Sequence, residues 1–193
     1  LAIEILKPDV NKSEYRFLAF EEKKIRYGLG AIKGLGSNIV DGILRERSSG
    51  GGYSSMIDLC KRVQEPRLNK KSLELLIKAG SFDSLEENRK ACFRKIELAL
   101  QLAEQDRLAK EVGQTDLFGL ESADNLDSTS HEEMKNLSNL ENDFSSEELL
   151  GWEKESLGLY LTGHPVDAYS QDIKVLATGS IAGMRVGKTK IAG

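Results

Sequence analysis

The sequence of 193 residues predicts a mainly α-helical fold with a short β segment at its start, an acidic flexible linker and an incomplete β segment at its end. Apolar residues recur at helical spacing through most of residues 28–111. Aromatic residues make up only 6% of the chain, too few for a large β core. The sequence has no run of about 18 apolar residues, so no membrane-spanning helix is expected.

Charge is unevenly distributed along the chain, although the net charge is only -4. Residues 1–100 carry a net charge of +5, whereas residues 101–150 carry -10. The basic part could approach a polyanion, and the acidic part would be repelled from it. The chain opens on Leu1 with no basic segment before an apolar one, so we expect no signal peptide and a piece of a longer, cytoplasmic protein.

The first 27 residues predict a small β segment. A short strand at 2–6 is stopped by Pro8, a turn follows at 9–13, and residues 15–20 and 24–27 form a possible hairpin.

Helical spacing then predicts a bundle whose helices are separated by capping residues. The expected helices are 28–33, 37–47 with Ser37 as N-cap, 55–64 capped by Ser55, 70–79 capped by Asn69 and stopped by Gly80, and 87–111. A flexible stop is expected at 48–52.

Residues 119–145 hold seven acidic residues and one Lys, which predicts a disordered linker. A connecting helix is expected within 146–161, in a segment that runs to residue 173. A strand at 181–186 is expected in the last segment, 174–193. Trp152, Leu157 and Tyr160 are expected on the buried face of the connecting helix, although they could also offer a stacking surface to single-stranded DNA.

The turn at 34–36 has the pattern of a helix-hairpin-helix motif. Gly34 and Gly36 flank Leu35, and a backbone without Cβ atoms can approach a surface closely. The following helix begins at Ser37 with unpaired N–H groups and a partial positive charge, which suits a DNA phosphate. Lys33 and Asn38 could add side-chain contacts, while Leu35 would anchor the turn in the core. The alternative is a turn that only packs.

A second turn, at Gly80 and Ser81, resembles the first, and Asn88, Arg89 and Lys90 follow it. Two such units side by side can reach both strands of a duplex. The fold prediction therefore becomes a tandem helix-hairpin-helix bundle over 28–111, with contacts that read no base sequence.

Four strings give the sequence a family resemblance. They are PDVNKS at residues 8–13, IRYGLGAIKGLG at 25–36, LLIKAGSFDSL at 75–85 and EKESLGLYLTGHP at 153–165. In this order they resemble the bacterial replicative DNA polymerase III alpha subunit, a C-family polymerase. The resemblance covers nearly all of the chain apart from the acidic linker.

The resemblance implies a place for each segment. Residues 1–27 would end the fingers, 28–111 would hold duplex DNA, and 174–193 would begin an oligonucleotide-binding (OB) fold. The catalytic carboxylates of the family lie in its palm, upstream of this segment, so we expect no catalytic residue, cofactor or metal site here. Mg²⁺ is expected only for the whole enzyme, which would act with other replicase subunits.

Residues 112–118 contain a short candidate motif for a partner protein. Gln114, Asp116, Leu117 and Phe118 match the pattern of peptides that bind the bacterial sliding clamp, and the family has an internal clamp-binding motif at this position. The two apolar side chains would fill a pocket, each contributing roughly 1.5–3 kcal/mol. Alternatively, Leu117 and Phe118 fold back onto the core.

Three functions therefore remain open. The first is a non-catalytic part of the polymerase that binds duplex DNA and the clamp during template-directed synthesis. The second is a stand-alone helix-hairpin-helix module of repair or recombination. The third is a structural helical domain with an acidic tail.

Cys60 and Cys92 are expected to be ordinary buried thiols, because they are too few for a disulfide framework and lie in apolar helical patterns.

Overall fold

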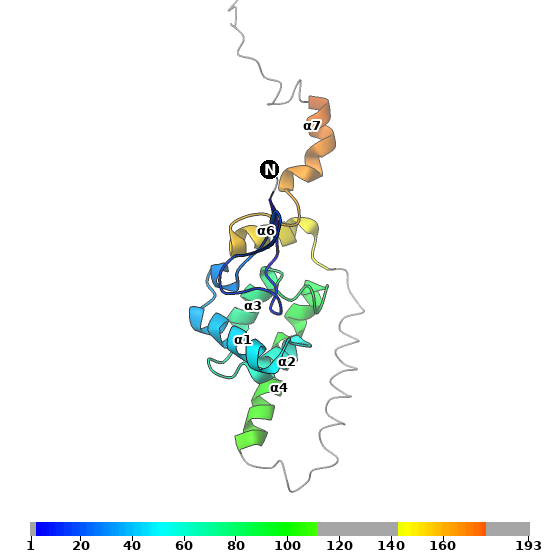
Figure 1. Ribbon diagram of the computed structural model, residues 1–193. Helices are drawn as coiled ribbons and strands as arrows, with labels where there is room; N and C mark the ends of the chain where they lie inside the picture. Colours follow the sequence, from blue (N-terminus) through cyan, green and yellow to red (C-terminus); the bar gives the residue numbers. More distant parts are fainter. Residues whose placement is uncertain (1–2, 112–142, 177–193) are drawn as a thin grey trace, which may run out of the picture.

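The computed structural model describes residues 3–111 and 143–176 and confirms the mainly helical prediction (Figure 1). Its strands are β1 Glu4–Leu6, β2 Leu18–Glu21 and β3 Lys24–Arg26. Its helices are the 3₁₀ turns η1 Leu29–Ala31 and η2 Pro165–Tyr169 and the α-helices α1 Ser37–Gly50, α2 Met56–Arg62, α3 Lys70–Lys78, α4 Arg89–Glu111, α6 Ser146–Leu157 and α7 Ser170–Leu176. Within these two ranges, no helix combines the length and the apolar character that a membrane crossing requires.

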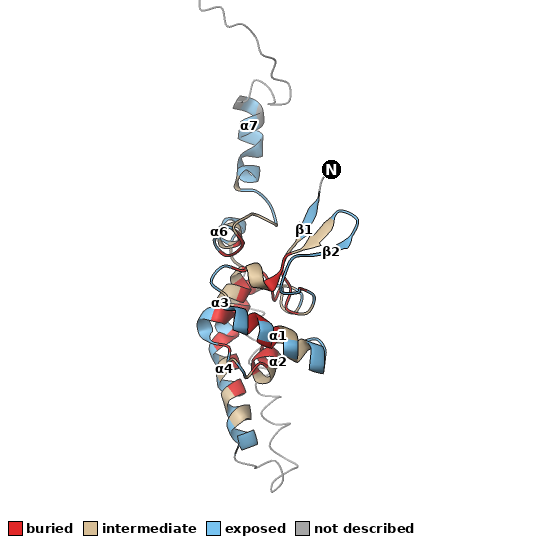
Figure 2. Cartoon of the chain, turned by 60° about the vertical axis from the view of Figure 1, so that its left-hand side comes forward, coloured by how far each residue is buried: buried red, intermediate tan, exposed pale blue. Residues whose placement is uncertain are grey.

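The N-terminal β segment forms a three-stranded sheet in the order β1-β3-β2. β2 and β3 form the predicted antiparallel hairpin, with an irregularity between Ala19 and Glu21. β1 pairs in parallel with the other side of β3, so that Ile5 lies opposite Ile25. The sheet projects from the helical body, and β1 and β2 are largely exposed (Figure 2).

The helix predicted at 28–33 is reduced to the short η1. The Leu29 N–H donates to the Glu14 carbonyl and the Gly30 N–H to the Tyr15 carbonyl, at 2.9 Å each. A Cβ on Gly28 would lie 2.4 Å from the backbone carbon of Arg16. The close approach of two backbone segments at these glycines competes with regular helical bonding here and leaves only a 3₁₀ turn.

The capping residues set the limits of the central helices. Ser55 accepts from the Asp58 N–H at the start of α2, as predicted, and Asn69 forms a reciprocal capping box with Ser72 at the start of α3. Gly80 follows α3 with φ +77°, the left-handed conformation that glycine tolerates. The predicted stop at 48–52 begins too early, because α1 continues to Gly50.

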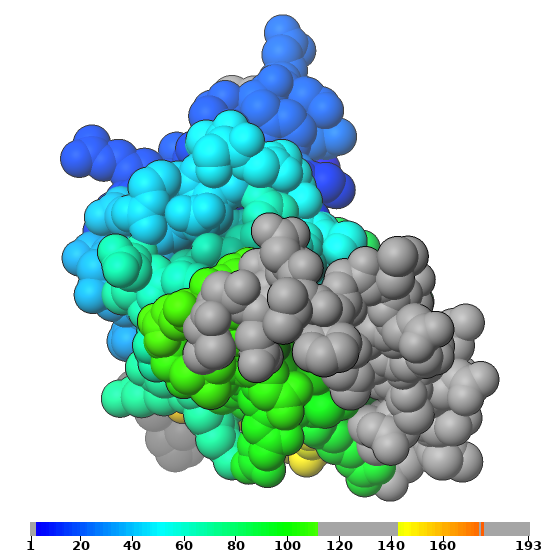
Figure 3. All heavy atoms as spheres, turned by 90° about the horizontal axis from the view of Figure 1, so that it is seen from below, coloured from blue at the N-terminus to red at the C-terminus, as the bar shows by residue number. Residues whose placement is uncertain are grey.

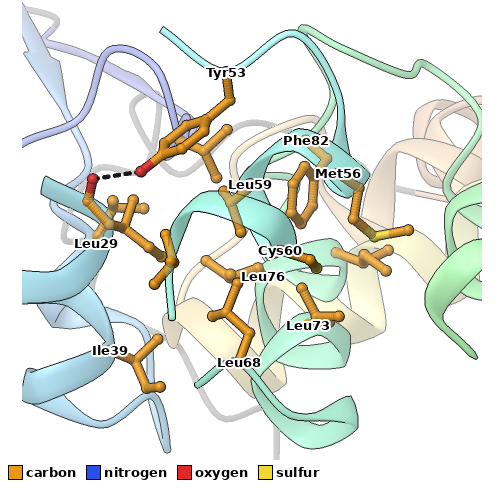
Figure 4. Close-up of a cluster of buried hydrophobic side chains, with 14 of the residues drawn as sticks. Leu29, Ile39, Tyr53, Met56, Leu59, Cys60, Leu68, Leu73, Leu76 and Phe82 are labelled. Carbon is orange, nitrogen blue, oxygen red and sulfur yellow. Dashed lines mark hydrogen bonds between the residues drawn. The ribbon is translucent and has the colours of Figure 1, made fainter. Parts of the chain in front are cut away.

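The core is formed by side chains of η1, α1, α2, α3 and α4 and of the loops between them, and Figure 4 shows part of it. Leu29, Leu59, Leu73 and Leu76 are completely buried. The buried Tyr53 hydroxyl donates a hydrogen bond of 2.7 Å to the Ile43 carbonyl. Cys60 and Cys92 are both buried, as predicted, and this burial raises the pKa of each thiol to about 12.

α4 spans the bundle and extends beyond it. It packs against α2 and α3, and in Figure 3 its green atoms lie against the cyan surface around α2. Its buried positions end at Ala103, so the last turns are mainly exposed (Figure 2). It begins at Arg89, two residues later than the predicted 87.

α6 packs against the bundle instead of only leading away from it. The Trp152 ring lies 5.3 Å from the Phe93 ring of α4, and Leu157 is 4% exposed within the core. This half-buried position favours a packing role for Trp152 over the stacking alternative. The helix ends at Leu157, before the predicted 161, because Gly158 adopts φ +81°.

Both ends of the described C-terminal range differ from the predictions. The predicted end of the linker, residue 145, is too late, because Asp143 already accepts a hydrogen bond of 3.1 Å from the Lys90 backbone N–H. The segment predicted to begin a β fold at 174 starts inside α7. The remaining linker residues and the predicted strand at 181–186 lie outside the described residues.

Candidate nucleic-acid interface

The first glycine turn is exposed and tightly folded. The Leu35 N–H donates 3.3 Å to the Ile32 carbonyl, and Gly34 between them has φ +81°. Lys33, Gly34 and Gly36 are exposed, while Leu35 is half-buried and packs against the core. The prediction that Leu35 anchors an outward-facing turn is confirmed.

The backbone amides after this turn are available to a ligand. Gly36 is the N-cap of α1, so the prediction of Ser37 as N-cap is wrong; Ser37 is the first helical residue. Within the described ranges, the N–H groups of Gly36, Ser37 and Asn38 have no acceptor. These are the orphan donors of a helix start, and no acidic side chain lies in the first turn to compete for them.

Asn38 folds back over the turn. Its Oδ1 accepts from the Ile39 N–H at 2.9 Å and would lie 2.8 Å from a Cβ on Gly36. The oxygen therefore serves a donor that is already inside the helix. Its exposed side chain remains at the rim of the turn, where it was predicted.

α6 holds the other side of the turn. The Lys33 backbone N–H donates 2.9 Å to the Ser156 carbonyl, and the Lys33 ammonium would lie 3.0 Å from a Cβ on Gly158. The carbonyl end of a helix carries partial negative charge, which favours the nearby cation. This support was not predicted; the sequence signal for it is the apolar pattern that ends at Leu157 and is followed by Gly158.

The second glycine turn faces the protein interior. Gly80 is buried and Ser81 is 0% exposed; the Ser81 carbonyl accepts from the Val10 N–H at 3.0 Å. The loop at 9–13, of which Asp9, Val10 and Ser13 are buried, covers this turn. The prediction that Gly80 and Ser81 offer their backbone to DNA is therefore wrong for this arrangement.

The polar residues after the second turn serve the fold. Asn88 Oδ1 accepts from the Ala91 N–H at 2.8 Å, which caps α4. Arg89 is 3% exposed and binds both carboxylate oxygens of Asp83, at 2.7 and 2.9 Å. The half-buried Lys90 has its ammonium 5.9 Å from the centre of the Phe144 ring. Arg89 in particular cannot reach a phosphate without leaving the interior.

A sizeable cavity lies apart from the first glycine turn. It measures about 660 Å³ and lies between α6, the 162–169 segment and the Asp83–Arg89 pair. Five carboxylates line it, against Lys7, Arg89 and His164. This balance disfavours a polyanion, so the cavity does not extend the candidate interface.

The clamp motif and metal binding are the two remaining points of the site prediction. The clamp-motif residues Gln114, Asp116, Leu117 and Phe118 lie outside the described residues. No three His, Cys, Asp or Glu side chains of the described ranges gather as a metal site would require.

Comparison with known proteins adds the family context. A family model described as the helix-hairpin-helix motif matches residues 2–92. The DNA polymerase III subunit alpha of Borreliella burgdorferi is 42% identical over 175 residues, which are 90% of this chain and 15% of that protein. The chain is homologous to part of the DNA polymerase III alpha subunit. It covers the helix-hairpin-helix region of these proteins.

Other alpha subunits match the same extent of the chain. The protein of Neisseria meningitidis is 36% identical over 186 residues, 95% of this chain and 15% of its own length. That of Escherichia coli is 35% identical over 174 residues, 90% of this chain and 14% of its own length. The chain thus spans about 15% of the length of the curated relatives it matches.

Proposed function

We propose that this chain is a non-catalytic, duplex-DNA-binding part of a replicative DNA polymerase III alpha subunit. The observation that carries the proposal is the exposed turn at Lys33–Asn38, with three free amides at the start of α1. Homology over about 90% of the chain, α6 included, favours this function over a stand-alone repair module and over a purely structural domain.

The binding would be electrostatic and independent of base sequence. Backbone N–H groups donate to phosphate oxygens, which are the same at every nucleotide. The helix dipole adds a favourable field for the anion. Because the second turn is buried, one turn and its neighbouring cations make the contact, so a modest affinity with a measurable salt dependence is expected.

Ser37→Glu tests this mechanism without weakening the helix. A carboxylate in the first turn of α1 stabilises the helix by about 0.3–1 kcal/mol through its dipole, yet it repels a phosphate from the same amides. Ser49→Glu is the matched control, because it makes the same change at the exposed opposite end of α1.

The expected result is a loss of duplex binding of about tenfold or more for Ser37→Glu in an anisotropy titration at low salt. Ser49→Glu should change the affinity far less. Equal affinities for the two variants would contradict the role of the turn.

We also propose that residues 114–118 bind the sliding clamp. The Gln114, Leu117 and Phe118 pattern and the family position of the motif support this proposal. When DNA is held by the helical part of the same chain, even a weak peptide contact gains from high effective concentration. Leu117→Ala with Phe118→Ala in the full chain should abolish clamp binding in a surface-capture assay. Unchanged binding would contradict the proposed clamp contact and favour the alternative, in which Leu117 and Phe118 pack against the core.

A further inference from the structure

Most cationic side chains near the bundle surface are already engaged. On α3, Lys70 pairs with Glu97 at 2.9 Å, and Lys78 pairs with Glu155 of α6 at 3.3 Å. Lys71 is exposed and has no carboxylate within ion-pair distance among the described residues. Neutralised lysines attract a polyanion only weakly, so Lys71 stands apart from its neighbours.

The position of Lys71 relates it to the glycine turn. Leu75 touches the turn, since its Cδ1 would lie 3.4 Å from a Cβ on Gly34. Lys71 is four residues before Leu75 on α3, so the two side chains share a helix face about 6 Å apart. The flexible stem of a lysine spans that distance, which brings its ammonium within reach of the rim of the turn.

The capping box at the N-terminus of α3 leaves fewer free amides there than at the start of α1. Asn69 Oδ1 accepts from the Ser72 N–H at 2.9 Å, and the Ser72 hydroxyl accepts from the Asn69 N–H at 2.9 Å. The capping box thus consumes donors at this helix start. The Asn69 and Ser72 amides are therefore unavailable to an anion near α3, whereas the exposed Lys71 ammonium is available to it.

We propose that Lys71 is a second phosphate contact of the duplex-binding surface, next to the amides at Gly36–Asn38. The inference rests on the proposed function. It extends the contact from one helix start to a neighbouring helix and makes the surface bipartite: backbone donors on α1 hold one phosphate, and an ammonium on α3 neutralises another on the same duplex.

The test measures duplex binding by the full chain as a function of salt. Lys71→Gln is compared with Lys70→Gln. The control removes the same charge from the neighbouring residue, a lysine that is already paired with Glu97. Each phosphate contact contributes about 0.9 to the slope of log affinity against log salt. Lys71→Gln should lower that slope by about this amount and weaken binding several-fold at low salt, Lys71→Arg should restore both, and Lys70→Gln should change neither.

Equal slopes for wild type and Lys71→Gln, or equal losses for the two glutamine variants, would overturn the inference. Ser37→Glu measured in the same series separates the two proposals. If Ser37→Glu loses binding while Lys71→Gln retains the wild-type slope, the turn binds DNA and Lys71 does not. If the wild type shows no salt-dependent binding, both proposals fail.

Discussion

The Tyr27 hydroxyl donates a hydrogen bond of 2.9 Å to the Leu157 carbonyl, across 130 residues of sequence. Tyr27 leads into the first glycine turn, and Leu157 is the last residue of α6. Together with the bond from the Lys33 N–H to the Ser156 carbonyl, it fixes the candidate DNA-binding turn to a helix that follows the acidic segment. The turn proposed to bind DNA is therefore held in place by residues of both described ranges.

Removing the Tyr27 hydroxyl should weaken this connection. Tyr27→Phe leaves the buried Leu157 carbonyl without its donor, and the free energy of unfolding should fall by about 1 kcal/mol. Urea unfolding followed by circular dichroism measures the change. Tyr15→Phe is the control, since Tyr15 is 37% exposed and its hydroxyl has no partner in the described ranges. Equal stabilities for the two variants would show that the bond contributes nothing.

Two glycines of the α6 region should respond to alanine with opposite signs. Gly158 has φ +81° and lies against the Lys33 side chain, so Gly158→Ala should destabilise the fold by about 1–2 kcal/mol. Gly151 lies inside the helix with no neighbour within 4 Å of an added Cβ. Gly151→Ala should therefore stabilise the fold by about 0.5–1 kcal/mol. Thermal unfolding of both variants checks the signs, and a destabilised Gly151→Ala would contradict the expectation.

Local signals made much of this fold predictable. Ser55 and Asn69 correctly predicted the starts of α2 and α3. A side-chain oxygen at the N-cap accepts from an unpaired backbone amide, and this interaction depends only on the local sequence. Gly80 announced the end of α3 for a similarly local reason. The exposure of the first turn followed from the same kind of pattern.

The errors came from contacts between distant segments. The second turn has the local sequence of a binding turn, yet the loop at 9–13 buries it through the Val10–Ser81 hydrogen bond. Gly28 and Gly30 were predicted to be helical. In the structure, the segment after β3 that contains them packs closely against residues 15–16. The adjacent residues Lys70 and Lys71 cannot be distinguished from the sequence, because only the structure shows that Glu97 pairs with Lys70.

Arg89 distinguishes a structural second turn from one that binds DNA. Its ion pair with Asp83 is largely buried, and breaking such a pair typically costs about 3–5 kcal/mol. Because Asp83 keeps Lys7 at 2.8 Å, the expected loss for Arg89→Ala is smaller, about 2–3 kcal/mol. Arg67→Ala removes an exposed pair with Glu104 and should cost less than about 1 kcal/mol.

Arg89→Ala should also leave the salt dependence of duplex binding unchanged under conditions where it is folded. A slope lowered by about 0.9 together with unchanged stability would return the second turn to the binding surface.

The two buried cysteines predict a loss of stability at alkaline pH. Burial raises the pKa of Cys60 and of Cys92 to about 12, whereas an unfolded thiol ionises near pH 8.5. Below that pH both states are protonated and the thiols add no pH dependence. Above it the unfolded state releases protons first, so the free energy of unfolding falls by up to about 1.4 kcal/mol per pH unit for each thiol until the folded pKa is reached.

Cys60→Ala should flatten that dependence. At pH 7 the variant is expected to be less stable than the wild type because it loses a buried side chain. Between pH 9 and 11 the gap should narrow, since the variant has one fewer group to ionise on unfolding. Urea titrations at intervals of half a pH unit measure both curves. Parallel curves across this range would contradict the prediction, because they would mean that the Cys60 thiol ionises equally in the folded and unfolded chain.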